Sequence, residues 1–283
     1  MRRVILLLSS AVMLVIAASA AQAVTLRYRG KAGEVRKYSY ADATRMQSEG
    51  GGVETRMEST STALLAQKIK SVDDGVLTIE QKLTKGKTTA KVEGMDEPMK
   101  EDLPEVTILI KMDAQGRIKQ FKSEEGFMTM APTQELGRVL AEMGMFPKRD
   151  LKVGDTWSDE KEITEGDIGT IKIHYTRKLS ALEPYRKRNC AKIETKFNGA
   201  IEPPEDIMNG DDMPGAEFEA TIRFSGTAVT WFDHEAGVVV EEDNTMKMLM
   251  EMRFTMPAIG AGEDVEHSSK MATIVNTKMA LQK

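Results

Sequence analysis

The 283-residue sequence has few of the residues on which most catalytic and metal centres depend. It contains one cysteine and three histidines. A single cysteine excludes an intramolecular disulfide and any zinc site built from cysteine pairs. Three histidines exclude most histidine-rich metal centres. The phosphate-binding loop, the His-Glu-x-x-His motif and the Gly-x-Ser-x-Gly turn are all missing. The sequence therefore predicts neither an enzyme nor a cofactor.

A strong charge imbalance is also missing. The chain has 39 Lys and Arg against 44 Asp and Glu, a net charge of −5. A nucleic-acid partner would need a concentrated basic face, so none is expected. Carboxylates gather between Glu205 and Glu217. Their spacing does not match a known calcium loop, and we expect no metal there.

The first 23 residues have the order of a secretory signal peptide. Arg2 and Arg3 precede an apolar run, and Ala21-Gln22-Ala23 offers a small-residue cleavage site. The run of about 13 residues is shorter than the roughly 20 that span a membrane. We therefore expect cleavage after Ala23, export to the periplasm or the exterior, and no transmembrane segment in the mature chain. Cys190 would then be unpaired, and we interpret it as a small residue at the start of a strand.

A period of two dominates the rest of the chain and is typical of β-strands. Short turns join the long strands: Asp74-Gly75 predicts a hairpin, and Lys85-Gly86 predicts another turn. The alternation changes parity after Ser225-Gly226, which predicts a β-bulge. Long strands joined by short turns pair antiparallel. The predicted fold class is all-β, with curved sheets forming an open barrel or a sandwich.

One segment departs from this period. Leu136, Val139, Leu140 and Met143 have helical spacing between Pro132 and Gly144. This predicts a first β unit at 24–127, a helix and linker at 128–150, and a second β unit at 151–283. Lys31–Val35 and Lys152–Thr156 are similar, which favours two related units. One continuous antiparallel sheet with similar turns explains the same pattern.

The order of several short motifs resembles a family of secreted bacterial proteins known only as a domain of unknown function. The motifs are Leu26–Tyr28, Gly33-Glu34, Met112-Asp113 with Gly116, Lys152–Trp157, and Phe232-Asp233 with Gly237. The resemblance covers nearly the whole mature chain. It implies an extracytoplasmic β-rich protein and supplies no catalytic residues.

The most informative pattern is a stripe of methionines in a chain with 20 Met and 5% aromatic residues. Met246, Met248, Met250, Met252 and Phe254 share one parity, so they would lie on one face of a strand. Three interpretations stay open: filling of an irregular core, an adaptable pocket for an acyl chain, and a thioether ladder for Cu(I). We take the five side chains as the candidate ligand-binding residues.

The sequence thus favours a non-enzymatic binding or scaffolding protein of the bacterial cell envelope that carries an apolar or lipid ligand. The alternatives are a structural module that binds an envelope protein and no small molecule, a methionine-based copper-binding protein, and a hydrolase. The identity of the ligand or partner is not predicted.

Overall fold

The computed structural model describes residues 23–123, 145–165, 169–202, 217–256 and 265–282. The described elements are the strands β1 (Val35–Gly50), β2 (Val53–Asp73), β3 (Val76–Val92), β4 (Met99–Leu103), β5 (Val106–Met112), β6 (Ile118–Ser123), β7 (Thr156–Glu165), β8 (Gly169–Tyr185), β9 (Arg188–Glu202), β10 (Glu217–Asp233), β11 (Val238–Met256) and β12 (Val265–Leu281). The predicted helix at 132–144 and nearly all of the predicted signal peptide lie outside the described residues. No helix within these ranges is long and apolar enough to cross a membrane.

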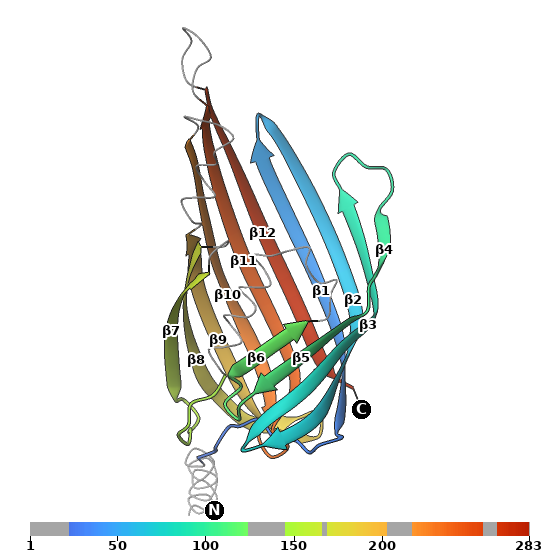
Figure 1. The fold of residues 1–283 in the computed structure, drawn as a ribbon, viewed down its shortest axis with the longest axis vertical. Helices are drawn as coiled ribbons and strands as arrows, with labels where there is room; N and C mark the ends of the chain where they lie inside the picture. The colour runs from blue at the N-terminus through green and yellow to red at the C-terminus, as the bar shows by residue number, and fades with distance from the viewer. Residues whose placement is uncertain (1–22, 124–144, 166–168, 203–216, 257–264, 283) are drawn as a thin grey trace, which may run out of the picture.

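All twelve strands belong to one antiparallel sheet in the order β6-β5-β3-β2-β1-β12-β11-β10-β9-β8-β7, with β4 paired to β3. The predicted all-β antiparallel class is confirmed. Strand β1 pairs with β12, so the segments expected to form two β units share one sheet. Over the described residues the sheet stays open, with β6 and β7 at its edges (Figure 1). The sheet is therefore an open, curved trough.

The concave face of this trough is identified by Tyr28, which lies in the segment before β1. Its ring centroid is 5.3 Å from that of Phe232 on β10. Tyr28 also packs against the cluster of Ile69, Leu77 and Ile79 on β2 and β3. One side chain thus contacts strands that are far apart in the strand order. The face that bears these residues is therefore the inner, concave one.

The turns and irregularities follow from local backbone chemistry. Asp74 and Gly75 have φ of 50° and 77°, which confirms the predicted hairpin turn. The turn predicted at Lys85-Gly86 is wrong, because β3 continues through both residues. There Lys85 has φ of 53°, and the register between β2 and β3 shifts opposite it, as in a β-bulge. A positive φ thus marks a bulge as well as a turn.

The bulge predicted after Ser225-Gly226 is also wrong. The pairing of β10 with β11 is regular from Glu217 to Trp231 and shifts only between Trp231 and Phe232. The sequence pattern changes parity without a bulge because apolar residues lie on the inner face before Gly226, and the apolar Trp231 after it lies on the outer face. Trp231 packs on the outer face, where its ring stacks on Tyr185 with centroids 4.6 Å apart.

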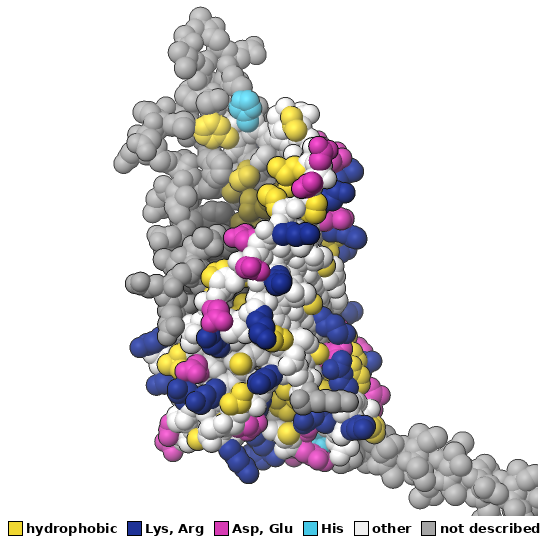
Figure 2. Space-filling model, turned by 90° about the vertical axis from the view of Figure 1, so that its right-hand side faces the viewer, with side chains coloured by type: hydrophobic (Ala, Val, Ile, Leu, Met, Phe, Trp, Pro, Cys, Tyr) yellow, Lys and Arg dark blue, Asp and Glu magenta, His cyan; other side chains and the backbone are white. Residues whose placement is uncertain are grey.

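The outer face of β1 and β2 carries charges of both signs. Arg45 is 3.2 Å from Glu58, and Arg56 is 2.6 Å from Glu54. Figure 2 shows dark blue and magenta side chains interspersed over this side of the molecule. Exposed ion pairs add little stability, but they keep a long sheet face soluble.

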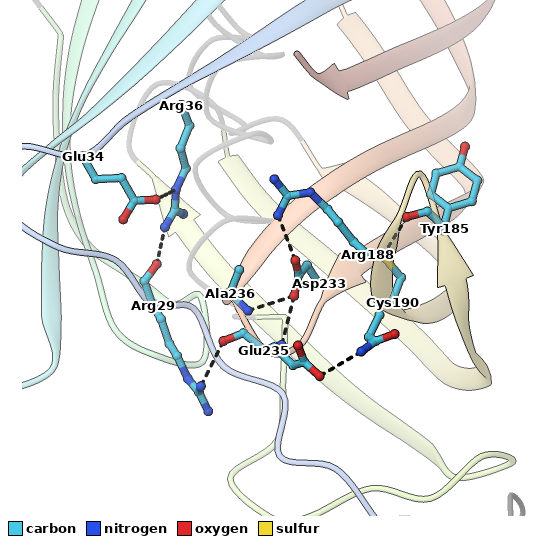
Figure 3. A network of polar contacts seen from close by, with 10 residues as sticks. Arg29, Glu34, Arg36, Tyr185, Arg188, Cys190, Asp233, Glu235 and Ala236 are labelled. Carbon is cyan, nitrogen blue, oxygen red and sulfur yellow. Dashed lines mark hydrogen bonds and ion pairs between the residues drawn. The ribbon is translucent and has the colours of Figure 1, made fainter. Parts of the chain in front are cut away.

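One end of the trough, here called the base, is closed by the segment before β1 (Figure 3). Arg36 donates hydrogen bonds to the Glu34 carboxylate and to the Arg29 carbonyl. The Arg29 guanidinium donates to the Glu235 carbonyl at 3.1 Å. Asp233 accepts from the backbone N–H of Glu235 and Ala236, and from Arg188 at 2.9 Å. These contacts join the segment to the β10–β11 turn.

Candidate functional site

The five candidate ligand-binding residues lie on the concave face of β11. Met246, Met248, Met250, Met252 and Phe254 are half-buried, whereas the intervening Lys247, Leu249 and Arg253 are exposed. Met246, Met248 and Met250 pack against a buried apolar cluster of β8 to β10. The structure thus places the predicted residues together on the inner side. Their predicted role in ligand binding stays a prediction.

Three further methionines extend this surface across the sheet. Met271 on β12 lies directly opposite Met250, and Met46 on β1 lies opposite Met57 on β2. All three are half-buried. We call the eight side chains the methionine surface: Met46, Met57, Met246, Met248, Met250, Met252, Phe254 and Met271. Sequence reasoning missed the first two and the last. The pairing of β11 with β12 places Met271 beside Met250, and the long-range pairing of β12 with β1 brings Met46 and Met57 to the same surface.

The methionine surface is continuous with a rigid apolar wall. The wall consists of the buried side chains Ile171, Ile173, Tyr175, Phe197, Ile201, Ile222 and Phe224. Burial therefore falls across the trough, from nearly complete on β8 to partial on β11, β12, β1 and β2. Because methionine is unbranched and flexible, the half-buried side can adapt its shape while the wall stays fixed.

A polar belt crosses the concave face on the base side of the methionine surface. It is one row of laterally paired residues: Ser61, Asp42, Thr277, Asn244, Ala228, Thr195 and Arg177. Burial raises the pKa of Asp42 and lowers that of Arg177, whose guanidinium lies 3.8 Å from the Tyr175 ring centroid. Within the described residues the Oδ1 atom of Asn244 is buried and accepts no hydrogen bond. The concave face is thus amphipathic along its length.

Below the belt lies a cavity of about 170 Å³, here called the basal cavity. Its polar lining comprises Tyr28, Arg36, Tyr38, Gln67, Gln81 and Glu242, and its apolar lining includes Ile79, Met112 and Met279. Burial raises the pKa of Tyr38 to about 12. Burial also raises the pKa of Glu242, although Thr230 donates a hydrogen bond to its Oε2 atom at 3.0 Å.

A larger hollow of about 650 Å³ lies on the opposite side of the sheet. The outward side chains that line it include Glu160, Lys172, Arg223 and Lys247. Leu249 and Ile274, each 37% exposed, also border it. The hollow is shallow, and it has both apolar side chains and charges of both signs along its lining.

The residues with metal-binding or nucleophilic chemistry are dispersed over the sheet, and one of them, His267, lies at the edge of the methionine surface. His174 is exposed on the outer face, and His234 lies in the β10–β11 turn. His267 is exposed on β12, directly opposite Phe254. Cys190 is fully buried, and burial raises the pKa of its thiol to about 11, which leaves it unreactive. In the parts of the chain that the structure covers, no cluster of His, Cys, Asp and Glu could hold a metal ion. Most of the acidic stretch 205–217 lies outside those parts.

Comparison with known proteins assigns no family. No family model and no curated protein matches the chain. A structure of lipovitellin is 12% identical over 90% of this chain, with a TM-score of 0.42, and the chain spans 26% of that protein. The COG4313 outer membrane channel of Pseudomonas putida F1 is 7% identical, over 90% of this chain and 97% of the channel, with a TM-score of 0.26. A DUF1329 family protein of Desulfovibrio piger is 12% identical, over 85% of this chain and 83% of that one, with a TM-score of 0.15.

Proposed function

We propose that this protein is a non-enzymatic binding module of the bacterial cell envelope that carries an apolar or lipid ligand on its methionine surface. The N-terminal order of basic, apolar and small residues supports an extracytoplasmic location. The side chains that could act in catalysis do not form a site. The three histidines lie on separate elements, and the thiol of Cys190 is buried.

The observation that carries the proposal is the partial burial of the methionine surface. A stripe that only filled a core would be as fully buried as Ile171 and Ile173, which are 0% and 1% exposed. Met246, Met248 and Met250 instead keep part of their surface accessible on the inner side of the trough. Accessible apolar surface on a concave face is typical of ligand sites, and flexible methionines suit ligands of variable shape.

A structural module that binds another envelope protein is the second candidate. The exposed Leu249 and Ile274 beside the outer hollow favour it. Thioethers also suit Cu(I), so a copper ladder would use the same side chains as a lipid. The three candidates differ in which face of β11 matters and in which ligand binds.

The experiment is a titration of the mature protein, residues 24–283, with the apolar fluorophore N-phenyl-1-naphthylamine. We expect saturable fluorescence enhancement that Met250→Leu preserves and Met250→Trp abolishes, since an indole on the inner face would cover the neighbouring methionines. Leu249→Trp places the same indole on the outer face and should bind the fluorophore normally. Loss with Leu249→Trp but not with Met250→Trp would refute the site. Saturation by Cu(I) without uptake of the fluorophore would favour the copper ladder instead.

A further inference from the structure

The base of the trough gathers exposed cations from three parts of the chain. Alternation in the segment before β1 directs Arg27, Arg29 and Lys31 away from the core, and all three are exposed. The stretch 148–152 lies beside them, because its backbone pairs with the start of this segment. The turn at 186–188 adjoins both through the β10–β11 turn, which Arg29 and Arg188 contact from opposite sides (Figure 3).

The base is positive in a chain that is negative as a whole. Twelve Lys and Arg against eight Asp and Glu, a net charge of +4, occur in the segments that form it: 24–37, 72–75, 113–117, 145–155, 185–189 and 233–237. The hairpin tips at the other end, 49–56 and 91–102, have three cations against seven anions, a net charge of −4 (Figure 1). The whole chain has a net charge of −5, so the positive base is a local feature.

Part of this positive charge is not neutralised by neighbouring carboxylates. Three of the basal carboxylates are already engaged, by Arg36, Arg149 and Arg188, at 2.7 to 2.9 Å. Three exposed cations form no ion pair with any described residue: Arg27, Lys148 and Lys187. These three come from the three different parts of the chain, so free positive charge is spread across the base.

Exposed apolar side chains accompany the cations. Val35 lies at the start of β1, Val72 lies near the end of β2, and Val153 follows Lys152 in sequence. All three are among the exposed large hydrophobic residues. Basic residues interspersed with apolar ones suit the interface of an anionic bilayer, where phosphate groups lie next to acyl chains.

The two ends of the molecule act independently on a charged surface. Strand β1 runs between them and has 16 residues, so at about 3.3 Å per residue it is roughly 53 Å long. The Debye length at physiological ionic strength is about 8 Å. A surface that meets the base is therefore screened from the acidic hairpin tips. An anionic surface attracts the base even though the whole protein is negative.

We propose that the base of the trough docks on the surface of an anionic lipid bilayer. The lipid phosphates lie against the exposed cations of 27–31, 148–152 and 186–188, and the acidic hairpin tips point away from the membrane. This inference goes beyond the proposed function and does not depend on it. Each basic residue close to such a surface strengthens binding about fivefold, so a few unpaired cations suffice for reversible docking.

The test is cosedimentation of the mature protein, residues 24–283, with sucrose-loaded vesicles in low-salt buffer. We expect binding to vesicles of phosphatidylglycerol mixed with phosphatidylcholine, no binding to pure phosphatidylcholine, and weaker binding as NaCl is added. The triple variant Arg27→Glu, Lys148→Glu and Lys187→Glu reverses the three unpaired cations. It should bind the anionic vesicles more than about tenfold more weakly than the wild type.

A second triple variant is the matched control. Lys91→Glu, Lys100→Glu and Lys196→Glu change the net charge by the same amount at exposed positions away from the base. This variant should bind within about twofold of the wild type, because its charges lie beyond a Debye length from the bilayer. Unfolding midpoints of both triple variants verify that neither is misfolded.

Three outcomes would overturn the docking: no sedimentation of the wild type with anionic vesicles, equal sedimentation with pure phosphatidylcholine, or equal losses in the two triple variants. Equal losses would mean that net charge and not the base determines binding. The proposed function is tested separately by fluorophore uptake in the absence of vesicles. Failure of either experiment therefore leaves the other conclusion standing.

Discussion

At the scale of the residue, the two faces of β11 place adjacent side chains in opposite environments. Met250 packs against the apolar cluster on the inner face, and Leu249 is 37% exposed on the outer face. Met250→Lys should destabilise by about 2 kcal/mol or more, because it desolvates an ammonium without a partner. Leu249→Lys should change the free energy of unfolding by less than about 0.5 kcal/mol. Urea denaturation measures both, and equal destabilisation would show that the parity of β11 is misassigned.

Glu242 gives a residue-scale prediction about pH. Its folded pKa is raised above the ordinary value of 4.5, chiefly by burial. The folded state therefore holds this proton more tightly than the unfolded state, and its contribution to stability is lost as pH rises above about 4.5 through the folded pKa. Glu242→Gln mimics the neutral carboxyl, so it should be more stable than the wild type at pH 8. The difference should shrink at pH 4, and a variant that is less stable at pH 8 would contradict the assignment.

At the scale of the element, Gly226 determines how β10 packs against β9. A Cβ atom there would lie 2.3 Å from the Phe197 ring and 2.5 Å from the Thr245 carbonyl oxygen. Because the carbonyl belongs to the paired strand, it cannot move aside easily. Gly226→Ala should therefore destabilise by about 1–3 kcal/mol. Chemical denaturation measures this loss, and Ser225→Ala on the outer face is the control. If Gly226→Ala leaves the free energy of unfolding unchanged, Phe197 does not occupy this position.

The same strand shows which parts of an element the sequence can predict. The alternation of β11 and the Asp74-Gly75 turn depend on neighbouring residues, and both appear as expected. The Ser225-Gly226 signal failed because an aromatic ring from β9 fills the place of the missing side chain. That contact is set by tertiary packing. The turn predicted at Lys85-Gly86 was wrong because a residue with positive φ occurs in β-bulges as well as in turns.

At the scale of the whole molecule, the site depends on contacts between distant parts of the chain. The pairing of β1 with β12 brings Met46 and Met57 to the methionine surface. Nothing in the sequence specified the partner of β1. The basal cavity likewise needs Tyr38 and Glu242 from opposite ends of the chain. Site residues within one strand were predictable, and those assembled across the sheet were not.

The closed base gives a whole-molecule prediction. Asp233 is 6% exposed and holds the β10–β11 turn through two backbone N–H groups and Arg188. Asp233→Ala leaves these donors unpaired and should cost about 2–3 kcal/mol. Glu235→Ala, in the same turn but exposed, should cost less than about 0.5 kcal/mol. Differential scanning calorimetry compares the two variants. Equal melting temperatures would show that the Asp233 contacts do not hold the base together.

The central claim is that the trough carries an apolar ligand, and native mass spectrometry of protein purified from the envelope of its own host tests it most directly. We expect a population heavier than the chain from Val24 to Lys283, with the added mass of one lipid-like molecule that collisional activation releases. Met250→Trp, prepared identically, should lack this added mass because the indole would cover the neighbouring methionines. A wild-type protein that carries no added mass, or only that of copper, would contradict the account.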